Sequence, residues 1–436
     1  MTTSETQVAT PTAAKKEEKK PVKPAAHFAG IHSEIIDALN FAEFGIAPKV
    51  QPPAQRGVLI ETERNRVTFS TYDFETAVSV TVPAATPAGR GSSLLDFPEL
   101  KKTLAAMVAG ETKAVAAQTR VSLAGDLLAT EHLTVPVTTH DVHAYTQPLQ
   151  AVPAVATMDV QTFLRQLNRV LPAACKDVTL PTLTGIQIVL DGDKLTMAAT
   201  DRYRFAVAEL PISATAAPLE KPLTALIPAA TLAALAKRLK AHDGPVGIGI
   251  LEDDHADGTP VADWPIARAT LSLGAVTITM RSLDGSLPKY LTLFSETYAI
   301  AVQLDRATTV RATQKCQATL KAKELRNVPV TFAWDTDGTL TLAPKMETAA
   351  DQARTKGMPI PATLAYGTGN ALHGVTASFN PAYLLDALDT FDSETVTLHL
   401  EELRDGAVFK PALLTEGPDA AGTGGYRHLL MPVRVR

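Results

Sequence analysis

The stretch at residues 195–211, LTMAATDRYRFAVAELP, decides how the chain folds, because a polar insert separates two apolar runs. Before the insert, apolar residues alternate with Thr196 and Ala198, and after it Phe205, Val207 and Leu210 resume an apolar run. Alternation with a period of two is typical of half-buried strands. The sequence therefore predicts two β-strands, and the insert Thr-Asp-Arg-Tyr-Arg between them needs a separate reason.

The same pattern of strand, turn and strand occurs three times along the chain. The copies begin at Val58, Ile186 and Val330, and their turns are rich in residues that tolerate tight hairpin geometry. Asp73 and Asp201 take the same place in the first two copies, 128 residues apart, and aligning Leu195 with Leu340 gives 145 residues for the next step. These periods are the size of domains and predict three related domains rather than a solenoid.

An amphipathic helix is predicted before and after each hairpin. In the second copy, residues 163, 164, 167, 170 and 171 are apolar and fall on one helical face. The predicted leading helices are 32–44, 159–171 and 305–320, and the trailing ones are 94–107, 228–239 and 380–391. Asp159 and Thr231 are suitable helix starts. Each repeat is therefore expected to be α+β, with strands in a sheet and two helices on one face.

The predicted organisation is a tail followed by three domains. Residues 1–26 hold no large apolar side chain except two valines and are expected to be disordered. The KKEEKK run within them is read as a solvated tail rather than a nucleic-acid arm, because its charges partly cancel. Clusters of Pro and Gly set the expected domains at 27–150, 151–286 and 287–436.

Composition is ordinary for a folded, water-soluble protein, with 45% hydrophobic, 20% charged and 5% aromatic residues in 436. No apolar run is long enough to cross a membrane, and no signal-peptide core stands at the N-terminus, so a cytoplasmic protein is expected. Cys175 and Cys316 are interpreted as plain thiols in a reducing compartment.

The net charge of −5 argues at first against a nucleic-acid partner. Basic residues nevertheless gather on the predicted helices, for example five Lys or Arg against one Asp in residues 305–323. A basic residue near a helix C-terminus can simply complement the helix dipole. Because the enrichment recurs in all three repeats, we expect a shared basic surface.

Four stretches resemble one known family, the bacterial DNA polymerase III β subunit or sliding clamp. Residues 179–211 are similar to its Leu-x-Gly strand followed by Ala-Thr-Asp-x-x-Arg-Leu-Ala. SLDGSLPKY (282–290) resembles its linker into the third domain, FNPAYLLDAL (379–388) a helix of that domain, and RHLLMPVRVR its C-terminal tail. Residues 28–150 fit only by pattern, which indicates a divergent member, and a phage gene is one origin consistent with that.

The resemblance implies a half-ring of three clamp domains with the helices on the inner face. Two chains would close head to tail into a homodimeric ring around duplex DNA, held without sequence recognition, and would confer processivity on a replicative DNA polymerase. It also implies an ATP-driven clamp loader and other proteins with clamp-binding motifs as partners, no catalysis, no cofactor or metal, no membrane, and a nucleoid-associated location in the cytoplasm.

The resemblance further implies that the Thr-Asp-x-x-Arg turn and the C-terminus line a hydrophobic pocket for partner peptides. Carried over by position, the expected pocket residues are Leu183, Thr200, Arg202, Tyr203, Arg204, Phe205, Pro245, Ile250, Leu429, Met431, Pro432, Val433 and Arg434. Arg202 and Tyr203 replace a Gly-His pair common in the family, and Val435 and Arg436 extend past its usual end. The peptide preference is therefore expected to differ.

The basic residues expected to face DNA come from the predicted helices and the segments beside them. They are Lys49, Lys101, Lys102, Arg165, Arg169, Lys176, Lys237, Arg238, Arg311 and Lys315.

Other functions find less support in the residues. The run 253–258 resembles a calcium loop, but Trp264 stands where a bidentate Glu is needed. The glycine runs at 367–370 and 422–425 lack the Lys of a phosphate loop, and His132, His140 and His143 have no Cys or carboxylate array beside them. The alternative that remains is a clamp-shaped scaffold that binds replication or repair proteins without encircling DNA.

Overall fold

The computed structural model describes residues 24–47, 52–82, 85–215, 218–252, 266–288, 293–295, 298–335, 338–368, 372–401, 403–404, 407–420 and 425–434. Residues 1–23 of the predicted tail, the calcium-like run at 253–258, Lys49, Val435 and Arg436 lie outside these ranges. Residues 24–26 differ from the expected disorder. Ala26 is buried, and its backbone N–H donates to Ser93 Oγ over 3.1 Å.

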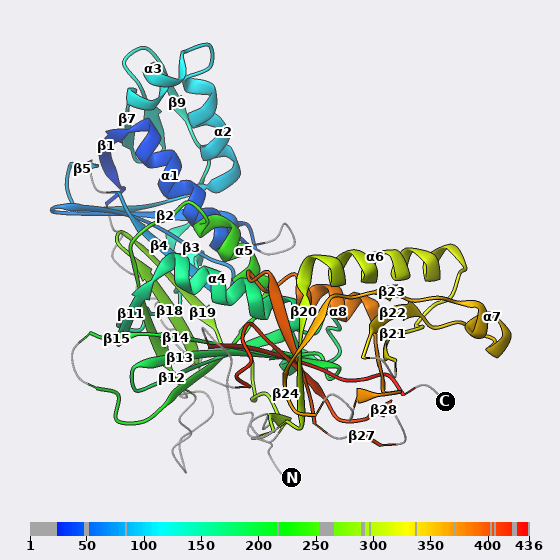
Figure 1. The fold of residues 1–436 in the computed structure, drawn as a ribbon. Coiled ribbons are helices and arrows are strands. Elements are labelled where there is room, and N and C mark those ends of the chain that lie inside the picture. Colours follow the sequence, from blue (N-terminus) through cyan, green and yellow to red (C-terminus); the bar gives the residue numbers. More distant parts are fainter. Residues whose placement is uncertain are drawn as a thin grey trace, which may run out of the picture.

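The chain bends into an arc, with the longer helices along its inner side and the sheets behind them (Figure 1). The leading helices are α1 (His32–Ala42), α4 (Val160–Val170) and α6 (Arg306–Ala322), and the trailing ones are α2 (Phe97–Met107), α5 (Ala229–Leu239) and α8 (Pro381–Leu388). The short helices α3 (Lys113–Gln118) and α7 (Ala349–Arg354) lie at the two ends of the arc. The predicted α+β repeat with two helices is confirmed.

The start of one helix differs from the predicted range. Helix α2 begins at Phe97 rather than residue 94, because residues 91–96 form a strand and Asp96 caps the helix by accepting from the Glu99 N–H. Helix α5 spans Ala229–Leu239, in agreement with the predicted range 228–239, but Thr231, also named as a suitable start, lies inside it. Asp159 does cap α4, since its Oδ1 accepts from the Thr162 N–H at 2.7 Å.

Two sheets contain the strands of the first repeat and part of the second repeat. The five-stranded sheet has the order β5 (Thr86–Pro87), β1 (His27–Ile31), β7 (Arg120–Ala124), β8 (Leu127–Ala129), β9 (Thr134–Pro136). The ten-stranded sheet has the order β10 (Thr139–His140), β6 (Gly91–Asp96), β2 (Gly57–Glu63), β3 (Arg66–Tyr72), β4 (Thr76–Thr81), β19 (Val276–Arg281), β18 (Arg268–Leu273), β17 (Pro245–Leu251), β11 (Ala156–Asp159), β15 (Ser213–Ala214).

The remaining described strands form two further sheets. The nine-stranded sheet has the order β16 (Leu223–Pro228), β12 (Gly185–Asp191), β13 (Lys194–Thr200), β14 (Arg204–Pro211), β30 (Tyr426–Leu430), β29 (Ala412–Thr415), β26 (Thr395–Leu400), β20 (Ile300–Asp305), β24 (Ala362–Tyr366). The six-stranded sheet has the order β23 (Met358–Pro359), β22 (Leu340–Pro344), β21 (Val330–Trp334), β25 (Thr376–Phe379), β28 (Ala407–Val408), β27 (Leu403–Arg404).

Each of the two long sheets crosses from one repeat into the next. In the ten-stranded sheet β4 pairs antiparallel with β19, and in the nine-stranded sheet β14 pairs antiparallel with β30. Strand β30 lies at the end of the chain, so the C-terminal segment completes a sheet of the middle repeat. Backbone hydrogen bonds therefore hold the repeats in sequence along the arc.

The first two repeats share the same turn in detail. Asp73 Oδ1 accepts from the N–H groups of Glu75 and Thr76 at 3.0 and 2.6 Å. The residue after each aspartate has a left-handed backbone, with φ of 76° at Phe74 and 78° at Arg202. Non-glycine residues rarely adopt this conformation, and here the aspartate side chain holds it by bonding the following N–H groups. The predicted repeat of 128 residues is thus present as a three-dimensional motif.

The apolar core lies between the sheets and the helices. Phe163, Leu167 and Val170 of α4 are buried in it, together with the alternate side chains Ala206 and Ala208 of β14. Cys316 of α6 is also buried, and burial raises the pKa of its thiol to about 11. Within the described ranges, no helix is long and apolar enough to span a membrane.

Buried polar groups join the second and third repeats behind β30. The Tyr426 hydroxyl lies 3.0 Å from the Arg169 carbonyl oxygen and 2.9 Å from both Thr390 Oγ1 and His428 Nδ1. Burial, and to a smaller extent the Arg204 charge, lowers the pKa of His428 to about 3. Burial likewise lowers the pKa of His399, whose Nε2 lies 2.7 Å from Thr415 Oγ1, to about 4. Both imidazoles are therefore neutral in the folded protein near pH 7.

Folding stability should fall as the pH is lowered from 7.5 to 5. Both imidazoles have folded-state pKa values below the unfolded value of about 6.5, so the unfolded chain gains protons first. Each histidine should then remove about 2 kcal/mol of unfolding free energy over this interval. Denaturant titrations at several pH values should show a shallower pH dependence for His428→Gln and His399→Gln. The matched change at the exposed His132, His132→Gln, should leave the dependence unchanged, and an equally steep curve for all three variants would contradict the assignment.

Candidate functional site

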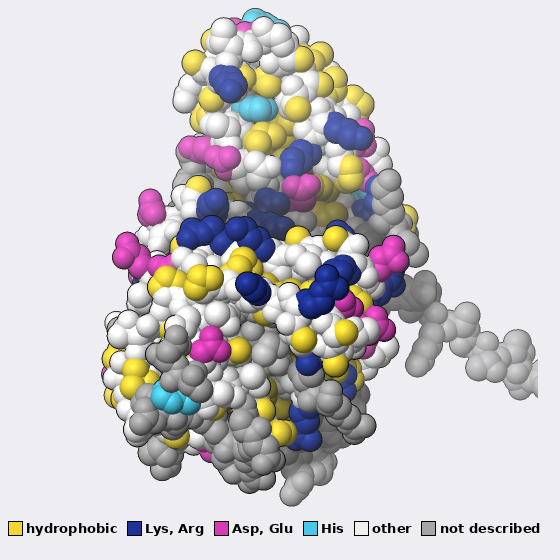
Figure 2. Space-filling view, turned by 45° about the vertical axis from the view of Figure 1, so that its right-hand side comes forward, with side chains coloured by type: hydrophobic (Ala, Val, Ile, Leu, Met, Phe, Trp, Pro, Cys, Tyr) yellow, Lys and Arg dark blue, Asp and Glu magenta, His cyan; other side chains and the backbone are white. Residues whose placement is uncertain are grey.

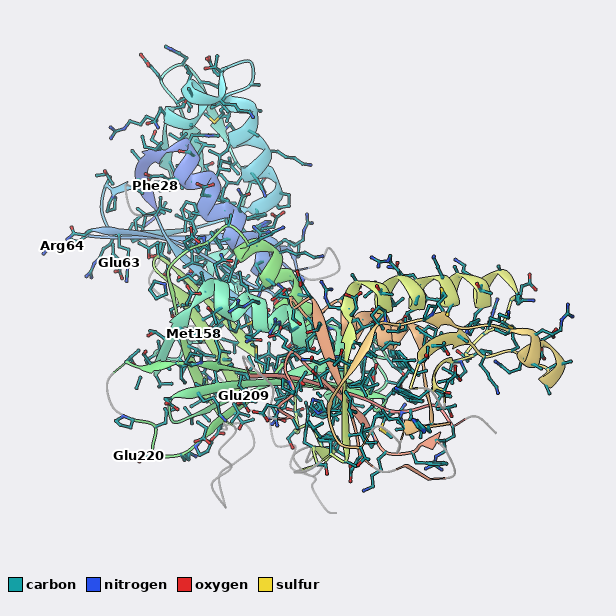
Figure 3. The ribbon with its side chains drawn as sticks, viewed as in Figure 1. Phe28, Glu63, Arg64, Met158, Glu209 and Glu220 are labelled. Atoms are coloured by element: carbon teal, nitrogen blue, oxygen red, sulfur yellow. The ribbon has the colours of Figure 1, made fainter. Side chains whose placement is uncertain are left out.

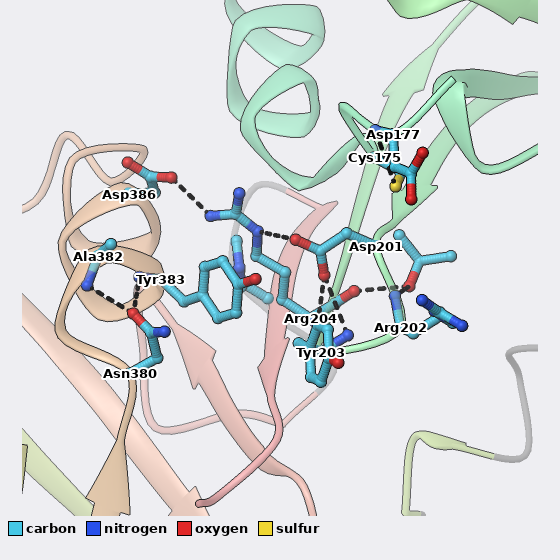
Figure 4. A network of polar contacts seen from close by, with 12 residues as sticks. Cys175, Asp177, Asp201, Arg202, Tyr203, Arg204, Asn380, Ala382, Tyr383 and Asp386 are labelled. Atoms are coloured by element: carbon cyan, nitrogen blue, oxygen red, sulfur yellow. Dashed lines mark hydrogen bonds and ion pairs between the residues drawn. The ribbon is translucent and has the colours of Figure 1, made fainter. Parts of the chain in front are cut away.

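The polar insert of the opening stretch forms the turn between β13 and β14 (Figure 4). Asp201 Oδ1 accepts from the N–H groups of Tyr203 and Arg204 at 3.0 and 3.1 Å. Thr200 Oγ1 donates to the Arg204 carbonyl at 2.7 Å and accepts from the Arg202 N–H at 3.1 Å. The insert thus supplies the hydrogen bonds of a tight turn and leaves the Tyr203 side chain 54% exposed.

An apolar cluster lies beside this turn, on the sheet face opposite the helices. Alternation along β14 sends Phe205 and Val207 to this face, whereas Ala206 and Ala208 join the main core. We call the following buried residues the outer apolar cluster: Ala198, Phe205, Val207, Leu226, Leu287, Tyr298, Leu413 and Leu429. Leu183, Leu283 and Phe294 are partly buried against it. The cluster therefore joins β14 and β30 with Leu283, Leu287 and Phe294.

Leu287 and Phe294 reach this face through specific contacts. The Leu287 N–H donates to Gln187 Oε1 at 2.9 Å, and the rings of Phe205 and Phe294 meet edge to face with centroids 6.3 Å apart. The Arg427 guanidinium lies 4.7 Å from the Phe294 ring centroid. These linker residues were not among the predicted site residues. Their available signal was their position in or just after the linker-like stretch 282–290, which the sequence marked without connecting it to the pocket.

The C-terminal segment leaves β30 at the same turn. The Met431 N–H donates to the Tyr203 carbonyl at 2.9 Å, and the Val433 N–H donates to the Ser378 carbonyl at 2.7 Å. Met431 is 44% exposed, next to the exposed Tyr203. Pro432 and Val433 are half-buried, and the Arg434 guanidinium lies 6.0 Å from the Phe409 ring centroid. We call the outer apolar cluster with the 200–205 turn and residues 431–433 the candidate partner site.

Most predicted pocket residues fall in or beside the candidate partner site, but two do not. Pro245 and Ile250 lie on β17 in the ten-stranded sheet, opposite Asp159 and Ala269. Ile250 is buried in the main core, so neither residue forms a wall of this site. Leu287 and Phe294 instead lie in the part of the site where the resemblance implied Pro245 and Ile250.

Arg204 is buried behind the exposed turn rather than open to the site. It is 5% exposed, and its Nε donates to Asp201 Oδ2 at 3.0 Å while a terminal nitrogen donates to Asp386 Oδ2 at 2.7 Å (Figure 4). The guanidinium also lies 4.6 Å from the Tyr383 ring centroid. Burial, followed by the nearby Asp201 carboxylate, raises the pKa of Tyr383. Arg204 thus links the turn to helix α8.

The inner side of the arc carries basic side chains. Figure 2 shows Lys and Arg gathered in a band across the middle of the face that it presents. Of the residues predicted to face DNA, six are exposed: Lys102, Arg165, Lys176, Lys237, Arg311 and Lys315. Lys176 differs from the others because it lies in the loop after α4, next to Asp177, whose pKa falls through hydrogen bonds to Thr179 and, more weakly, the charge of Arg202. Glu63 and Glu220, by contrast, lie on the side away from the helices (Figure 3).

Three predicted basic residues are engaged within the chain. Lys101 and Arg238 both reach Glu43 Oε2, at 2.8 and 3.5 Å, and the hydrogen bond from Lys101 lowers the pKa of that carboxyl. Both side chains remain partly exposed. Arg169 is wrong as a DNA-facing residue, because it is 6% exposed and pairs with Asp392 and Glu416 at 2.8 and 2.6 Å.

Within the described ranges, no group of three or more His, Cys, Asp or Glu side chains is arranged to hold a metal ion. His140 Nε2 lies 3.5 Å from Asp96 Oδ2.

Comparison with known proteins gives consistent similarities over the whole chain. Residues 157–289 match the family described as DNA polymerase III beta subunit, central domain. The beta sliding clamp of Micrococcus luteus is 30% identical over 291 residues, covering 64% of this chain and 84% of that protein. The beta sliding clamp of Streptomyces coelicolor is 28% identical over 429 residues, covering 92% of this chain and 97% of that protein.

Solved structures share the fold. The beta subunit of the Streptococcus pyogenes DNA polymerase superposes with a TM-score of 0.73 at 18% identity, covering 94% of this chain and all of that one. The DNA polymerase sliding clamp of Bacillus subtilis gives a TM-score of 0.72 at 16% identity, with the same 94% of this chain covered. With the three repeats and their paired helices, these similarities place the chain in the DNA polymerase III β-subunit family, the β sliding clamps.

Proposed function

We propose that the protein is a DNA sliding clamp: two copies close head to tail around duplex DNA, and the candidate partner site holds linear segments of a replicative DNA polymerase, an ATP-driven clamp loader and other replication proteins. The observation that most directly supports this proposal is that helices from all three repeats present exposed Lys and Arg side chains on the inner side of the arc. The domains in this proposal are residues 27–150, 151–286 and 287–436.

The proposed mechanism is topological rather than catalytic. A closed ring stays on DNA because the duplex cannot leave sideways, so no base needs to be recognised. Exposed Lys and Arg side chains attract phosphates without sequence preference, which allows sliding. Acidic residues on the far side, such as Glu63 and Glu220, would disfavour DNA there.

The two ends of the arc offer complementary surfaces for ring closure. At the first end, Val115, Leu127 and Leu133 are 53%, 44% and 45% exposed, beside the edge strand β9. At the other end, a hollow of about 800 Å³ between α6 and α8 is lined by Leu320, Leu325 and Val328, with Lys321 and Arg326 at its side. Joining unlike surfaces in this way gives a heterologous contact, which closes when the rotation between subunits permits.

The ring predicts a particle of twice the chain mass of 46.3 kDa in size-exclusion chromatography with light scattering. Leu133→Arg should shift the protein toward a monomer, because it places a charge in the proposed apolar contact. The same change at another exposed apolar residue, Val178→Arg, should keep the dimer. A wild-type protein that stays monomeric at micromolar concentration would contradict ring closure.

Encirclement predicts retention that depends on the ends of the DNA. Linear duplex is anchored to beads at one end, threaded with the protein, and then blocked at the free end. A ring should resist a high-salt wash, which screens phosphate contacts, and should be released when a restriction enzyme cuts the duplex. A scaffold that does not encircle DNA would wash off in salt whether or not the end is blocked, and that result would favour the alternative function.

The same assay tests whether the basic residues of the inner face contact DNA, with an outer-face variant as the control. The triple variant Arg165→Ser, Lys237→Ser, Lys315→Ser should thread more slowly, and each lost phosphate contact should reduce the slope of log affinity against log salt by about 0.9. The matched outer variant Arg64→Ser, Arg66→Ser, Lys221→Ser removes as much charge beside Glu63 and Glu220 and should behave like the wild type. Equal behaviour of the two variants would remove the inner face from the proposal.

The partner site predicts a role for the C-terminal tail. Deleting residues 431–436 removes Met431 and the segment bonded to Tyr203 and Ser378 but spares Leu430, which is buried in β30. A fluorescein-labelled heptapeptide, selected by phage display on the intact chain, should bind the deletion at least about tenfold more weakly, since buried anchor side chains carry most interface energy. The dimer mass should not change. Unaltered peptide affinity would refute the site.

A further inference from the structure

Arg204 occupies a position that joins the candidate partner site to a helix of the third repeat. Its side chain comes from β14, whereas Asp386 and Tyr383, which it contacts, belong to α8 (Figure 4). Its side chain is 4% exposed, Asp201 is 11% exposed, and Asp386 is 45% exposed toward solvent. The guanidinium therefore bridges a buried carboxylate of the turn and a carboxylate on the helix-bearing side.

The exposed Tyr203 side chain of the site is held in place through the contacts of Arg204. The rings of Tyr203 and Tyr383 stack with centroids 5.9 Å apart and an interplanar angle of 24°. The Tyr203 backbone is held on both sides, by Asp201 Oδ1 at its N–H and by the Met431 N–H at its carbonyl. The Tyr203 ring itself is held by the Tyr383 ring, and Tyr383 in turn lies over the Arg204 guanidinium.

The chemistry of this bridge needs an arginine. A planar guanidinium can donate to two carboxylates at once and lie against an aromatic ring, whereas an ammonium group offers one compact point of charge. Replacing Arg204 by lysine keeps the charge but loses one carboxylate contact and the planar contact with Tyr383. The expected consequence is movement of Tyr383 and, through it, of Tyr203.

We propose that Arg204 is a positioning residue of the partner site: it fixes the Tyr203–Tyr383 wall across the boundary between the second and third repeats, and it does not itself touch the bound segment. This inference rests on the proposed function of the site. It replaces the direct peptide contact that the sequence implied for Arg204.

A double-mutant cycle separates positioning from direct contact. The readouts are the affinity for the same fluorescein-labelled heptapeptide, the dimer mass and the unfolding temperature, measured on the full chain. Arg204→Lys and Tyr203→Ala should each weaken binding about tenfold, and the double variant should bind no more weakly than Tyr203→Ala alone, as expected for residues that act through one contact. Losses that multiply would show that Arg204 contacts the peptide and would overturn the inference.

Asp386 on α8 allows an independent test of the same inference. Asp386→Asn should reproduce the loss seen for Arg204→Lys, although Asp386 lies outside the partner site, and its effect should also vanish in the Tyr203→Ala background. The matched variant Asp389→Asn, at the exposed end of the same helix, should bind the peptide as the wild type does. Wild-type affinity for Asp386→Asn would overturn the inference, and this arm decides the question if Arg204→Lys does not fold.

Failure of the inference and failure of the proposed function give different results. If no peptide selected on the intact chain needs residues 431–436 for binding, the assignment of the partner site is wrong, and so is the role of Arg204. If the wild type binds such a peptide and the losses multiply, only the role of Arg204 is wrong.

Discussion

The antiparallel pairing of β14 with β30 is the constraint on which the rest of the structure depends. It joins a strand of the middle repeat to the last strand of the chain, in a register that sets Phe205 opposite Leu429 and Arg204 opposite Leu430. Because side chains alternate between the two faces of a sheet, a shift of one residue would turn Leu429 toward the helices and His428 toward solvent. The same register brings the Met431 N–H to the Tyr203 carbonyl. One set of backbone hydrogen bonds thus builds both the joint between repeats and the floor of the partner site.

The polar groups behind this joint explain why the repeats meet in one orientation. The Arg169 side chain extends from α4 and pairs with Asp392 and Glu416. The Arg169 carbonyl oxygen accepts a hydrogen bond from the Tyr426 hydroxyl. The Arg169 and Glu416 side chains are only 8% and 18% exposed, and removing one partner of such a buried pair leaves a charge uncompensated, at a cost of about 3–5 kcal/mol, whereas Asp392 is 71% exposed and contributes less. Such groups tolerate few alternative geometries, so they fix how α4 sits relative to the third repeat. The alignment of the inner helices, on which the proposed encirclement of DNA rests, depends on residues that do not face the DNA.

Local pattern predicted the repeats, the hairpins and the paired helices, because these follow from alternation, turn chemistry and capping within about twenty residues. It could not predict which side chains the joints between repeats would cover. Arg169 follows Arg165 by one helical turn and shares its charge, yet the third repeat buries only Arg169. Most pocket residues that were carried over from adjacent motifs lie close together in the structure, whereas Pro245 and Ile250 were assigned across a less certain alignment and lie in another sheet. Leu287 and Phe294 were missed because a linker shows neither strand nor helix periodicity.

The side chains at the two joints, rather than the shared turn, explain why the outer apolar cluster forms between the second and third repeats. The turn at Asp73 has the same hydrogen bonds and the same left-handed residue as the turn at Asp201. Across the first joint, however, Ala77 pairs with Thr279, where Phe205 pairs with Leu429 across the second. The linker residue Tyr145 is buried on that first face against Tyr72 and Ala77, next to the hydroxyl side chains of Ser79 and Thr277. On this face the strand pair at the first joint thus carries small and hydroxyl side chains, which bury less apolar area than Phe, Val and Leu, at about 25 cal/mol per Å². The apolar cluster there forms beside the strand pair, from Tyr72, Leu94 and Tyr145. Duplication therefore supplied two copies of the same scaffold, and the side chains on one strand pair decide which copy can hold an apolar partner.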